Sequence, residues 1–186
     1  MGSTYEYLMS SLPDLSFLNT EEAKKKVLGL LSKYVGAGAE GYTAAEMLDR
    51  EAGKFLPTNA FATFQKLRLR NIHEAEFQQS RSKVLATFSA MTFALKKELK
   101  IWRIAKQEGR SPSSRIAAIV GEGTPLEKEV RIIQYQWEQL EELTAGHYAD
   151  IEAVFAYKLK LLLLERWWSF DTEQGWAKFS QLTTKQ

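Results

Sequence analysis

The chain has no cysteine and only two histidines, His73 and His147, among its 186 residues. Without cysteine there are no disulfide bonds, thiolate nucleophiles or cysteine-bound zinc or iron–sulfur centres, and the composition suits a reducing compartment. Two histidines are also too few for a histidine-rich metal site. We therefore expect no metal, no cofactor and no small-molecule substrate, and we expect that the protein is not an enzyme.

Long apolar runs and a marked charge excess are also missing. The longest aliphatic run, Leu161 to Leu164, is far shorter than the roughly 20 residues that cross a membrane. The first residues lack the basic and apolar regions of a signal peptide, and Glu6 stands where myristoylation requires serine or threonine. The formal charge of +2 is too balanced to predict binding to nucleic acid or a membrane surface. We expect a cytoplasmic protein without direct membrane insertion.

The residues that are present favour a folded chain with a sizeable core. Hydrophobic residues make up 45% of the sequence and aromatic residues 12%. This content suffices for one domain over residues 1–186, with sub-regions 1–75 and 76–186.

Short helices are expected in the first sub-region, after a short extended segment at residues 5–8. Helices over 19–35 and 43–54 are predicted because an asparagine or threonine is followed three residues later by glutamate, the spacing of a capping box. A third helix should begin at Pro57 and run toward His73. The glycine cluster 36–41 lacks the Gly-Lys-Ser/Thr of a phosphate-binding loop and is expected to end the first helix.

Two long helices are expected between residues 81 and 143. Over 81–108, apolar side chains recur every three or four residues and form one stripe. Thr124-Pro125-Leu126-Glu127 is a strong helix start, and the apolar residues that follow it form a seam for a partner helix. The predicted fold class is all-α: an elongated bundle with a long antiparallel hairpin and a short extended N-terminal segment.

The remaining segments are a connector and a C-terminal pair of helices. Residues 109–123 are expected to connect the long helices, with a short helix near 116–120. The Thr-Ala-Gly break at 144–146 precedes an apolar helix over 148–168, and a final amphipathic helix should follow Asp171.

Carboxylates near this break offer the main candidates for chemistry. Glu141, Glu142, Asp150 and Glu152 could in principle act as acids or bases, but adjacent helical residues point to different sides and no nucleophile accompanies them. A solvated or interface face is the favoured interpretation. His147 is expected to fix the corner by a hydrogen bond, the alternative being a pH-sensitive contact.

Two further groups of residues are candidate binding surfaces. Basic residues on the first long helix could bind nucleic acid, but the acidic stretch 122–152 should face them if the long helices pack antiparallel, so no nucleic-acid binding is expected. The aromatic group at the C-terminus is interpreted as core, or as a partner surface where exposed. The basic residues are Lys96, Lys97, Lys100, Arg103, Lys106, Arg110 and Arg115, and the aromatic ones are Trp167, Trp168, Phe170, Trp176 and Phe179.

Both ends of the chain resemble one bacterial family. The C-terminal stretch carries Trp at 137, Glu-Glu-Leu-Thr at 141–144, His-Tyr at 147–148 and Glu-Arg-Trp at 165–167, and the chain opens with Tyr-Glu-Tyr-Leu and Ser-Ser-Leu-Pro-Asp-Leu. This pattern resembles an uncharacterised family encoded among V-type ATP synthase subunits, whose members are longer around residues 109–123.

The resemblance implies a non-catalytic subunit of a bacterial V/A-type rotary ATPase. Its role would be similar to that of the helical C/d-type subunit, which couples the central shaft to the membrane ring. The implied partners are other V-type ATPase subunits, and the implied location is the cytoplasmic face of the inner membrane. A general helical adaptor remains the alternative. The signature positions, structural or at a partner interface, are Tyr7, Pro13, Asp14, Trp137, Glu142, Leu143, Thr144, His147, Tyr148, Asp150, Ile151, Tyr157, Glu165, Arg166 and Trp167.

Overall fold

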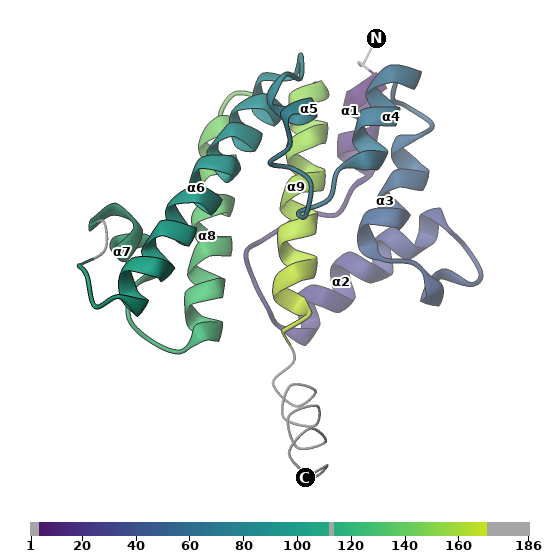
Figure 1. The fold of residues 1–186 in the computed structure, drawn as a ribbon. Helices are drawn as coiled ribbons and strands as arrows, with labels where there is room; N and C mark the ends of the chain where they lie inside the picture. Colours follow the sequence, from purple (N-terminus) through teal and green to yellow (C-terminus); the bar gives the residue numbers. More distant parts are fainter. Residues whose placement is uncertain (1–3, 112–113, 171–186) are drawn as a thin grey trace.

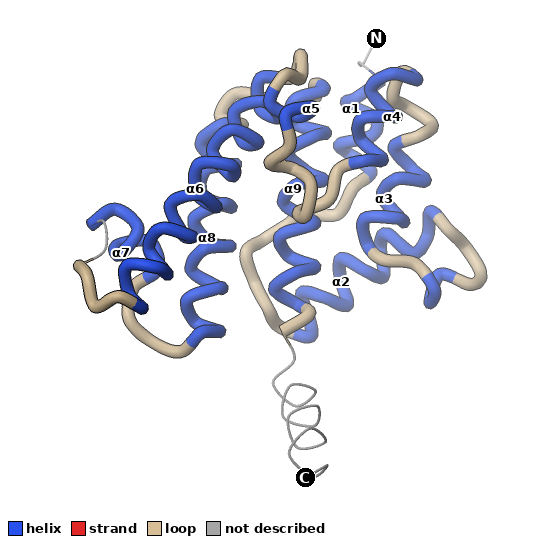
Figure 2. Tube along the Cα trace, viewed as in Figure 1, coloured by secondary structure: helices blue, strands red, loops and turns tan. Residues whose placement is uncertain are grey.

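The computed structural model describes residues 4–111 and 114–170, and this part of the chain contains helices and no strand (Figures 1 and 2). The predicted all-α class is confirmed. Two short 3₁₀ turns, Ser32–Tyr34 and Ala39–Gly41, follow the second helix. The α-helices are α1 (Thr4–Ser11), α2 (Glu21–Leu31), α3 (Ala44–Ala52), α4 (Thr58–Lys66), α5 (Ala75–Gln78), α6 (Lys83–Gln107), α7 (Ser114–Val120), α8 (Pro125–Leu143) and α9 (Ile151–Trp168).

Helix α9 lies between two groups of helices (Figure 1). On one side, α6 and α8 run antiparallel, with the short α7 packed at the end where their connection lies; on the other side lie α1 to α4. Because neighbours cover it on both sides, α9 buries almost every side chain from Ala153 to Leu164. This burial explains why its sequence is apolar all round rather than along one stripe.

The main hydrophobic core runs through both halves of the chain, from Leu8 to Leu164. A second, smaller cluster lies under α7, where Leu95 and Leu99 of α6 meet Ile116 and Val120. The predicted stripe on α6 is confirmed at Val84, Phe88, Leu95 and Leu99, all of which are buried. The short helix predicted near 116–120 corresponds to α7.

The two capping boxes with threonine are confirmed. Thr43 accepts a hydrogen bond from the Glu46 backbone N–H, and the Glu46 carboxylate accepts one from the Thr43 N–H. Thr124 and Glu127 do the same at the start of α8, next to Pro125. Each box satisfies backbone donors that the first helical turn leaves without partners.

The extended segment predicted for residues 5–8 is wrong, because these residues belong to α1. Tyr5, Leu8, Met9 and Leu12 all face the core, at the i, i+3, i+4 and i+7 spacing of one helix face. A four-residue window is too short to show this period. The burial of Leu8 against the core therefore selects helix where the local sequence is ambiguous.

Three helix ends also differ from the prediction. The cap of α2 is Thr20 rather than Asn19, and α9 begins at Ile151 with Asp150 as its cap. Helix α4 stops at Lys66, short of the predicted His73, because the Asn71 side chain bonds the Lys66 carbonyl and the Arg68 N–H. Such side-chain bonds to the backbone compete with helix. The final helix predicted after Asp171 lies outside the described residues.

Basic residues of α6 and acidic residues of α8 face one another at one place, where Lys96, Arg103 and Glu129 line the same pocket. Among the described residues, ion pairs join α8 to α9, through Glu129–Arg166 and Glu141–Lys160, and α6 to α7, through Glu98–Arg115, but none joins α6 to α8. Apolar and aromatic residues pack at this contact instead, Leu95 and Leu99 of α6 with Ile132 and Tyr135 of α8. Within the described ranges, no helix has the length and apolarity needed to span a membrane.

Candidate functional site

Signature positions from both ends of the chain meet at one corner of the molecule. The segment after α1 lies against the α8–α9 turn and the first half of α9, and together they line a cleft of about 180 Å³, here called the corner cleft. Five signature residues line it: Pro13, Asp14, Thr144, His147 and Tyr157. Residues more than 130 positions apart in the sequence therefore share one site.

A buried hydrogen bond joins the two ends of the chain at this cleft. The Tyr157 hydroxyl donates to the Pro13 carbonyl oxygen, with 2.6 Å between the oxygens. Burial, with a smaller contribution from Tyr34 and Asp14, raises the pKa of Tyr157, so its hydroxyl remains a donor. Pro13 is itself buried, and its carbonyl has this tyrosine as a partner inside the core. The contact positions α1 on α9.

His147 fixes the corner, as the sequence predicted. Its Nδ1 lies 2.5 Å from Asp150 Oδ2, and the other carboxylate oxygen accepts the Ala153 N–H as the cap of α9. The partly buried Asp150 keeps a pKa below its usual value, because these hydrogen bonds outweigh the desolvation that acts against them. The Thr144 hydroxyl donates to the Leu140 carbonyl and closes the end of α8.

The signature tryptophans pack beside the cleft and do not line it. Trp137 is buried, with 7% of its surface exposed, which confirms that it belongs to the core. The Phe17 ring lies 5.5 Å from Trp137 and is stacked at 4.3 Å on Trp167. Lys160 lines the cleft and lies 5.3 Å over the Trp137 ring. The residues after α1 are thus held by aromatic packing as well as by Tyr157.

Two signature tyrosines stay in solvent. Tyr7 of α1 is 65% exposed and Tyr148, just before α9, is 81% exposed. Helix α1 packs against α9, and α1 lies at the end of the molecule where α9 begins (Figure 1). Glu142 is exposed as well, whereas Leu143 packs against the core. These exposed side chains are therefore not part of the core.

Glu165 and Arg166 do not join the corner cleft. The Glu165 carboxylate accepts the Ala45 N–H at 3.2 Å, at the start of α3, and burial raises its pKa in spite of this bond. Arg166 points to the other side of α9 and pairs with Glu129. Both residues tie α9 to neighbouring helices, one on each side.

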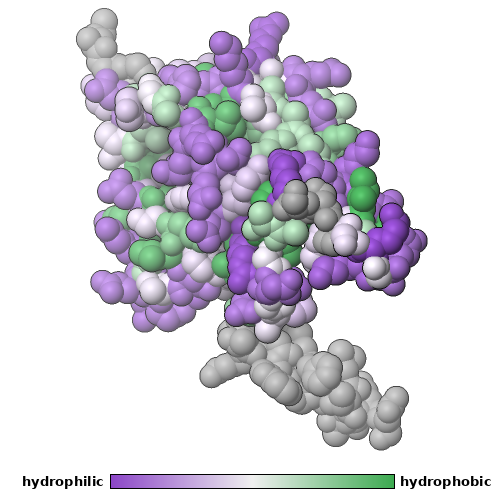
Figure 3. Space-filling model, turned by 90° about the vertical axis from the view of Figure 1, so that its left-hand side faces the viewer, coloured by the Kyte–Doolittle hydropathy of each residue, from purple (hydrophilic) through white to green (hydrophobic). Residues whose placement is uncertain are grey.

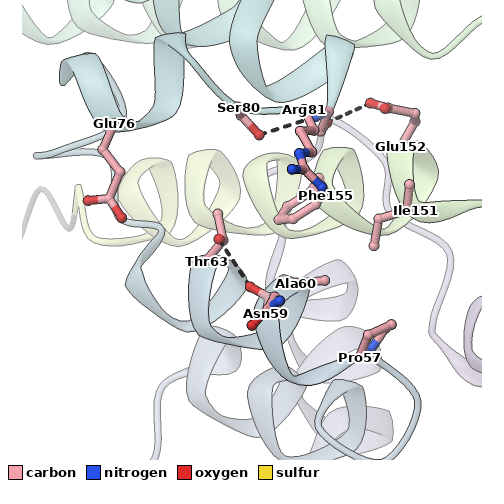
Figure 4. A pocket seen from close by; sticks show the side chains of 11 residues that line it. Pro57, Asn59, Ala60, Thr63, Glu76, Ser80, Arg81, Ile151, Glu152 and Phe155 are labelled. Carbon is pink, nitrogen blue, oxygen red and sulfur yellow. Dashed lines mark hydrogen bonds between the residues drawn. The ribbon is translucent and has the colours of Figure 1, made fainter.

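A second pocket, of about 500 Å³, lies between α4, the α5–α6 turn and the first turn of α9 (Figure 4). Arg81 and Phe155 both line this pocket, and their side chains overlap in the view of Figure 4. The signature residue Ile151 lines it too, and Glu152 at its edge accepts hydrogen bonds from Ser82 and the first backbone N–H groups of α6. This carboxylate, a candidate for acid–base chemistry on sequence grounds, is thus engaged as a helix cap.

A buried ion pair is the polar feature that sequence reasoning missed. Lys158 of α9 is fully buried and pairs with Asp49 of α3. Its sequence signal is a lysine within the most apolar stretch of α9. Within the described residues, no group of three or more histidine and carboxylate side chains is placed to hold a metal ion. Near the α8–α9 turn, Asp150 and Glu152 serve as helix caps and Glu141 as an ion-pair partner.

One side of α6 is also exposed and partly apolar. Phe93 is 49% exposed, Ile101 58% and Ile104 40%, and their spacing of eight and three residues brings them to one side of the helix. Figure 3, viewed from the α6–α7 side, shows hydrophobic patches separated by hydrophilic side chains.

One family model matches the chain, with the description "Protein of unknown function (DUF2764)", over residues 114–185. The matched region contains the C-terminal signature positions and the whole of α8 and α9. No curated protein and no solved structure matches the chain.

Proposed function

We propose that the protein is a non-catalytic subunit of a bacterial V/A-type rotary ATPase, located at the cytoplasmic face of the inner membrane through its contacts with shaft or ring subunits. The observation that carries the proposal is the meeting of signature residues from both chain ends at the corner cleft, with Tyr7 and Tyr148 exposed nearby. Those residues are the ones that resemble a family encoded with V-type ATP synthase subunits.

The proposed role is mechanical. A subunit that transmits or resists torque needs closely packed helices, because packed side chains have low compressibility and hold helices in register. Helices α6, α8 and α9 pack side by side, and the Pro13–Tyr157 bond joins α1 to them. A partner that contacts the corner would therefore act on a body whose helices move together.

Exposed aromatic residues suit the proposed contact. Tyrosine combines a large apolar surface with a hydroxyl and is enriched at protein interfaces. Tyr7 and Tyr148 keep 65% and 81% of their surface exposed in the described part of the chain, so burial does not account for such large side chains at these positions. The apolar side of α6, with Phe93 and Ile101, offers a second area to a large assembly.

The test is purification of the tagged protein from gently solubilised membranes of its native host, followed by mass spectrometry. We expect V-type catalytic, shaft and ring subunits to accompany the wild-type protein. The double variant Tyr7→Ala/Tyr148→Ala should lose them, because it removes the exposed rings at the corner. The matched control is Tyr42→Ala, since Tyr42 is another exposed tyrosine, 37% exposed, outside the signature.

The outcomes decide between the two hypotheses. Loss of the ATPase subunits in the double variant but not in Tyr42→Ala, with unchanged melting temperatures, would support the corner as the contact surface. Recovery of other proteins, while the ATPase subunits remain intact in the same extract, would contradict the proposal and favour a general helical adaptor.

A further inference from the structure

A pocket of about 340 Å³, here called the basic pocket, opens between α6, α8, α9 and the loop before α5. It is separate from the corner cleft and shares only Arg166 with the signature positions. Four cationic side chains line it: Arg70 from the loop, Lys96 and Arg103 from α6, and Arg166 from α9. One carboxylate, Glu129 of α8, lies among them.

The positive charges of the pocket exceed what its carboxylate can neutralise. Glu129 Oε1 accepts two hydrogen bonds from Arg166, from Nε at 3.0 Å and Nη2 at 2.5 Å, so this pair is already formed. Lys96 Nζ lies 3.0 Å from His73 Nδ1; lysine can only donate, so that ring nitrogen is the acceptor and brings no negative charge. Within the described residues, Arg70 and Arg103 have no carboxylate partner. The pocket therefore has an excess of positive charge.

A buried hydroxyl in the lining also lacks a partner. Thr92 of α6 is 3% exposed, and its Oγ1 has no hydrogen-bond partner in the described part of the chain. It lines the basic pocket beside Lys96. Buried hydroxyls in folded proteins nearly always have a partner, which can be protein, ordered water or a ligand. The hydroxyl oxygen is itself shielded from solvent, so an acceptor in the pocket supplies the missing partner once the Thr92 hydroxyl turns toward the pocket.

Apart from Gln136 of α8, the rest of the lining is apolar. Leu95 and Leu99, one and two turns after Thr92 on α6, are 2% and 8% exposed, and Ile132 of α8, which also lines the pocket, packs against their cluster. The volume lies at the lower end of the range for small-molecule sites. A bare inorganic ion would leave most of this space unfilled. The lining suits a ligand with one anionic end and a less polar body.

We propose that the basic pocket binds a small organic phosphate, with the phosphoryl oxygens near Lys96, Arg103 and Arg70 and the less polar part of the ligand over Leu95 and Leu99. Arginine is charged at every physiological pH, and its planar group matches phosphate oxygens. The same chemistry is offered by a soluble phosphate ester and by the headgroup of an anionic phospholipid. The proposal does not depend on the rotary-ATPase assignment.

The test uses calorimetric titration of the full-length protein with pyrophosphate and with ADP, and flotation with vesicles of phosphatidylglycerol or phosphatidylcholine. Lys96→Gln and Arg103→Gln should each weaken binding about tenfold or more, because each removes a charge-assisted contact. The matched control is Lys97→Gln, since Lys97 is the exposed neighbour of Lys96 on the same helix and does not line the pocket. It should change affinity less than about twofold.

Thr92→Val gives an independent readout. It keeps the shape of the side chain and removes the hydroxyl, so the ligand-free melting temperature should stay equal or rise while affinity falls several-fold. Each variant's circular dichroism and melting curve show whether it is folded. Because Arg103 is exposed, Arg103→Gln should fold even if Thr92→Val does not, and it then still tests the proposal.

The outcomes separate the sources of the phosphate. ADP binding, weaker in Lys96→Gln but not in Lys97→Gln, supports a soluble ligand; flotation with phosphatidylglycerol alone, with the same pattern of variants, supports a lipid headgroup. The proposal is overturned if no probe binds, if chloride or sulfate competes as well as pyrophosphate, or if Lys97→Gln weakens binding as much as Lys96→Gln. Such results would leave only diffuse surface charge.

Discussion

Lys158 of α9 donates a hydrogen bond to Asp49 of α3 inside the core, with 2.5 Å between Lys158 Nζ and Asp49 Oδ1. The same ammonium donates to the Phe64 carbonyl at 2.5 Å and lies 4.4 Å from the centre of the Phe64 ring. Three groups from α3 and α4 thus surround a lysine with no exposed surface. The pair joins α9 to the N-terminal helices and makes their relative position specific.

Removing one partner of this pair should strongly destabilise the protein. Lys158→Met leaves the Asp49 carboxylate buried, with only Arg68 at 4.0 Å to compensate. We expect a loss of about 3–5 kcal/mol in the free energy of unfolding, measured by urea denaturation. Asp49→Leu/Lys158→Met should recover most of the loss, because it removes both charges. Lys66→Met, at an exposed pair with Glu76, should cost at most about 1 kcal/mol. A Lys158→Met loss equal to this control would show that the buried pair contributes nothing specific.

The same lysine predicts a pH dependence of stability. Burial lowers the pKa of Lys158 from 10.5 to about 8, in spite of Asp49. Between these values the folded protein has released this proton while the unfolded chain still binds it, so stability attributable to Lys158 rises with pH. Between pH 7.5 and 10.5, the free energy of unfolding of the wild type, measured by urea denaturation, should rise relative to that of the Asp49→Leu/Lys158→Met variant. The rise should be on the order of a few kcal/mol. A constant or narrowing difference would contradict the lowered pKa.

Trp137 should contribute to stability rather than to partner binding alone. Trp137→Ala removes a buried ring that packs against Phe17, and a loss of about 3–5 kcal/mol in the free energy of unfolding is expected from the cavity it leaves. Phe93→Ala is the matched control. Because the Phe93 ring is 49% exposed, its removal should change the free energy of unfolding by no more than about 0.5 kcal/mol. An unchanged melting temperature in Trp137→Ala, together with loss of bound partners, would instead make Trp137 an interface residue.

Local signals in the sequence are sufficient for elements that are stabilised locally. The Thr43–Glu46 and Thr124–Glu127 boxes use partners three residues apart, so sequence spacing contains the whole interaction. The apolar stripe of α6 likewise predicts which of its sides is buried, because helix period alone sets it. The His147–Asp150 contact falls in the same class, since the partner lies three residues away.

Interactions between distant segments could not be predicted. Asp49 and Lys158 are 109 residues apart, and Tyr157 and Pro13 are 144 apart; no local pattern links either pair. The wrong interpretation of residues 5–8 has the same cause, since α1 is helical through packing on α9. The basic pocket could not be found either, because its cations come from separate helices and a loop. Only the fold brings them together.

Glu152 provides a final test of how distant residues stabilise local structure. Its carboxylate accepts hydrogen bonds from the Ser82 hydroxyl at 2.6 Å and from the Lys83 and Val84 N–H groups at 3.1 and 2.9 Å, so α9 caps the N-terminus of α6. Glu152→Ala should lower the free energy of unfolding by about 2 kcal/mol, because it removes an anion from a helix N-terminus and leaves these donors without their acceptor. Glu152→Gln, which keeps acceptor oxygen but not charge, should cost less.

A double-mutant cycle with Ser82→Ala isolates the contact between the two helices. Ser82 is itself the cap of α6, since its hydroxyl accepts the Leu85 N–H while donating to Glu152. If the two residues act as one cap, the losses from Ser82→Ala and Glu152→Ala, measured by urea denaturation, should add to more than the loss in the double variant, by about 0.5 kcal/mol or more. Strict additivity would mean that each residue caps α6 independently, and the Glu152 carboxylate would then act mainly through its charge at the start of the helix.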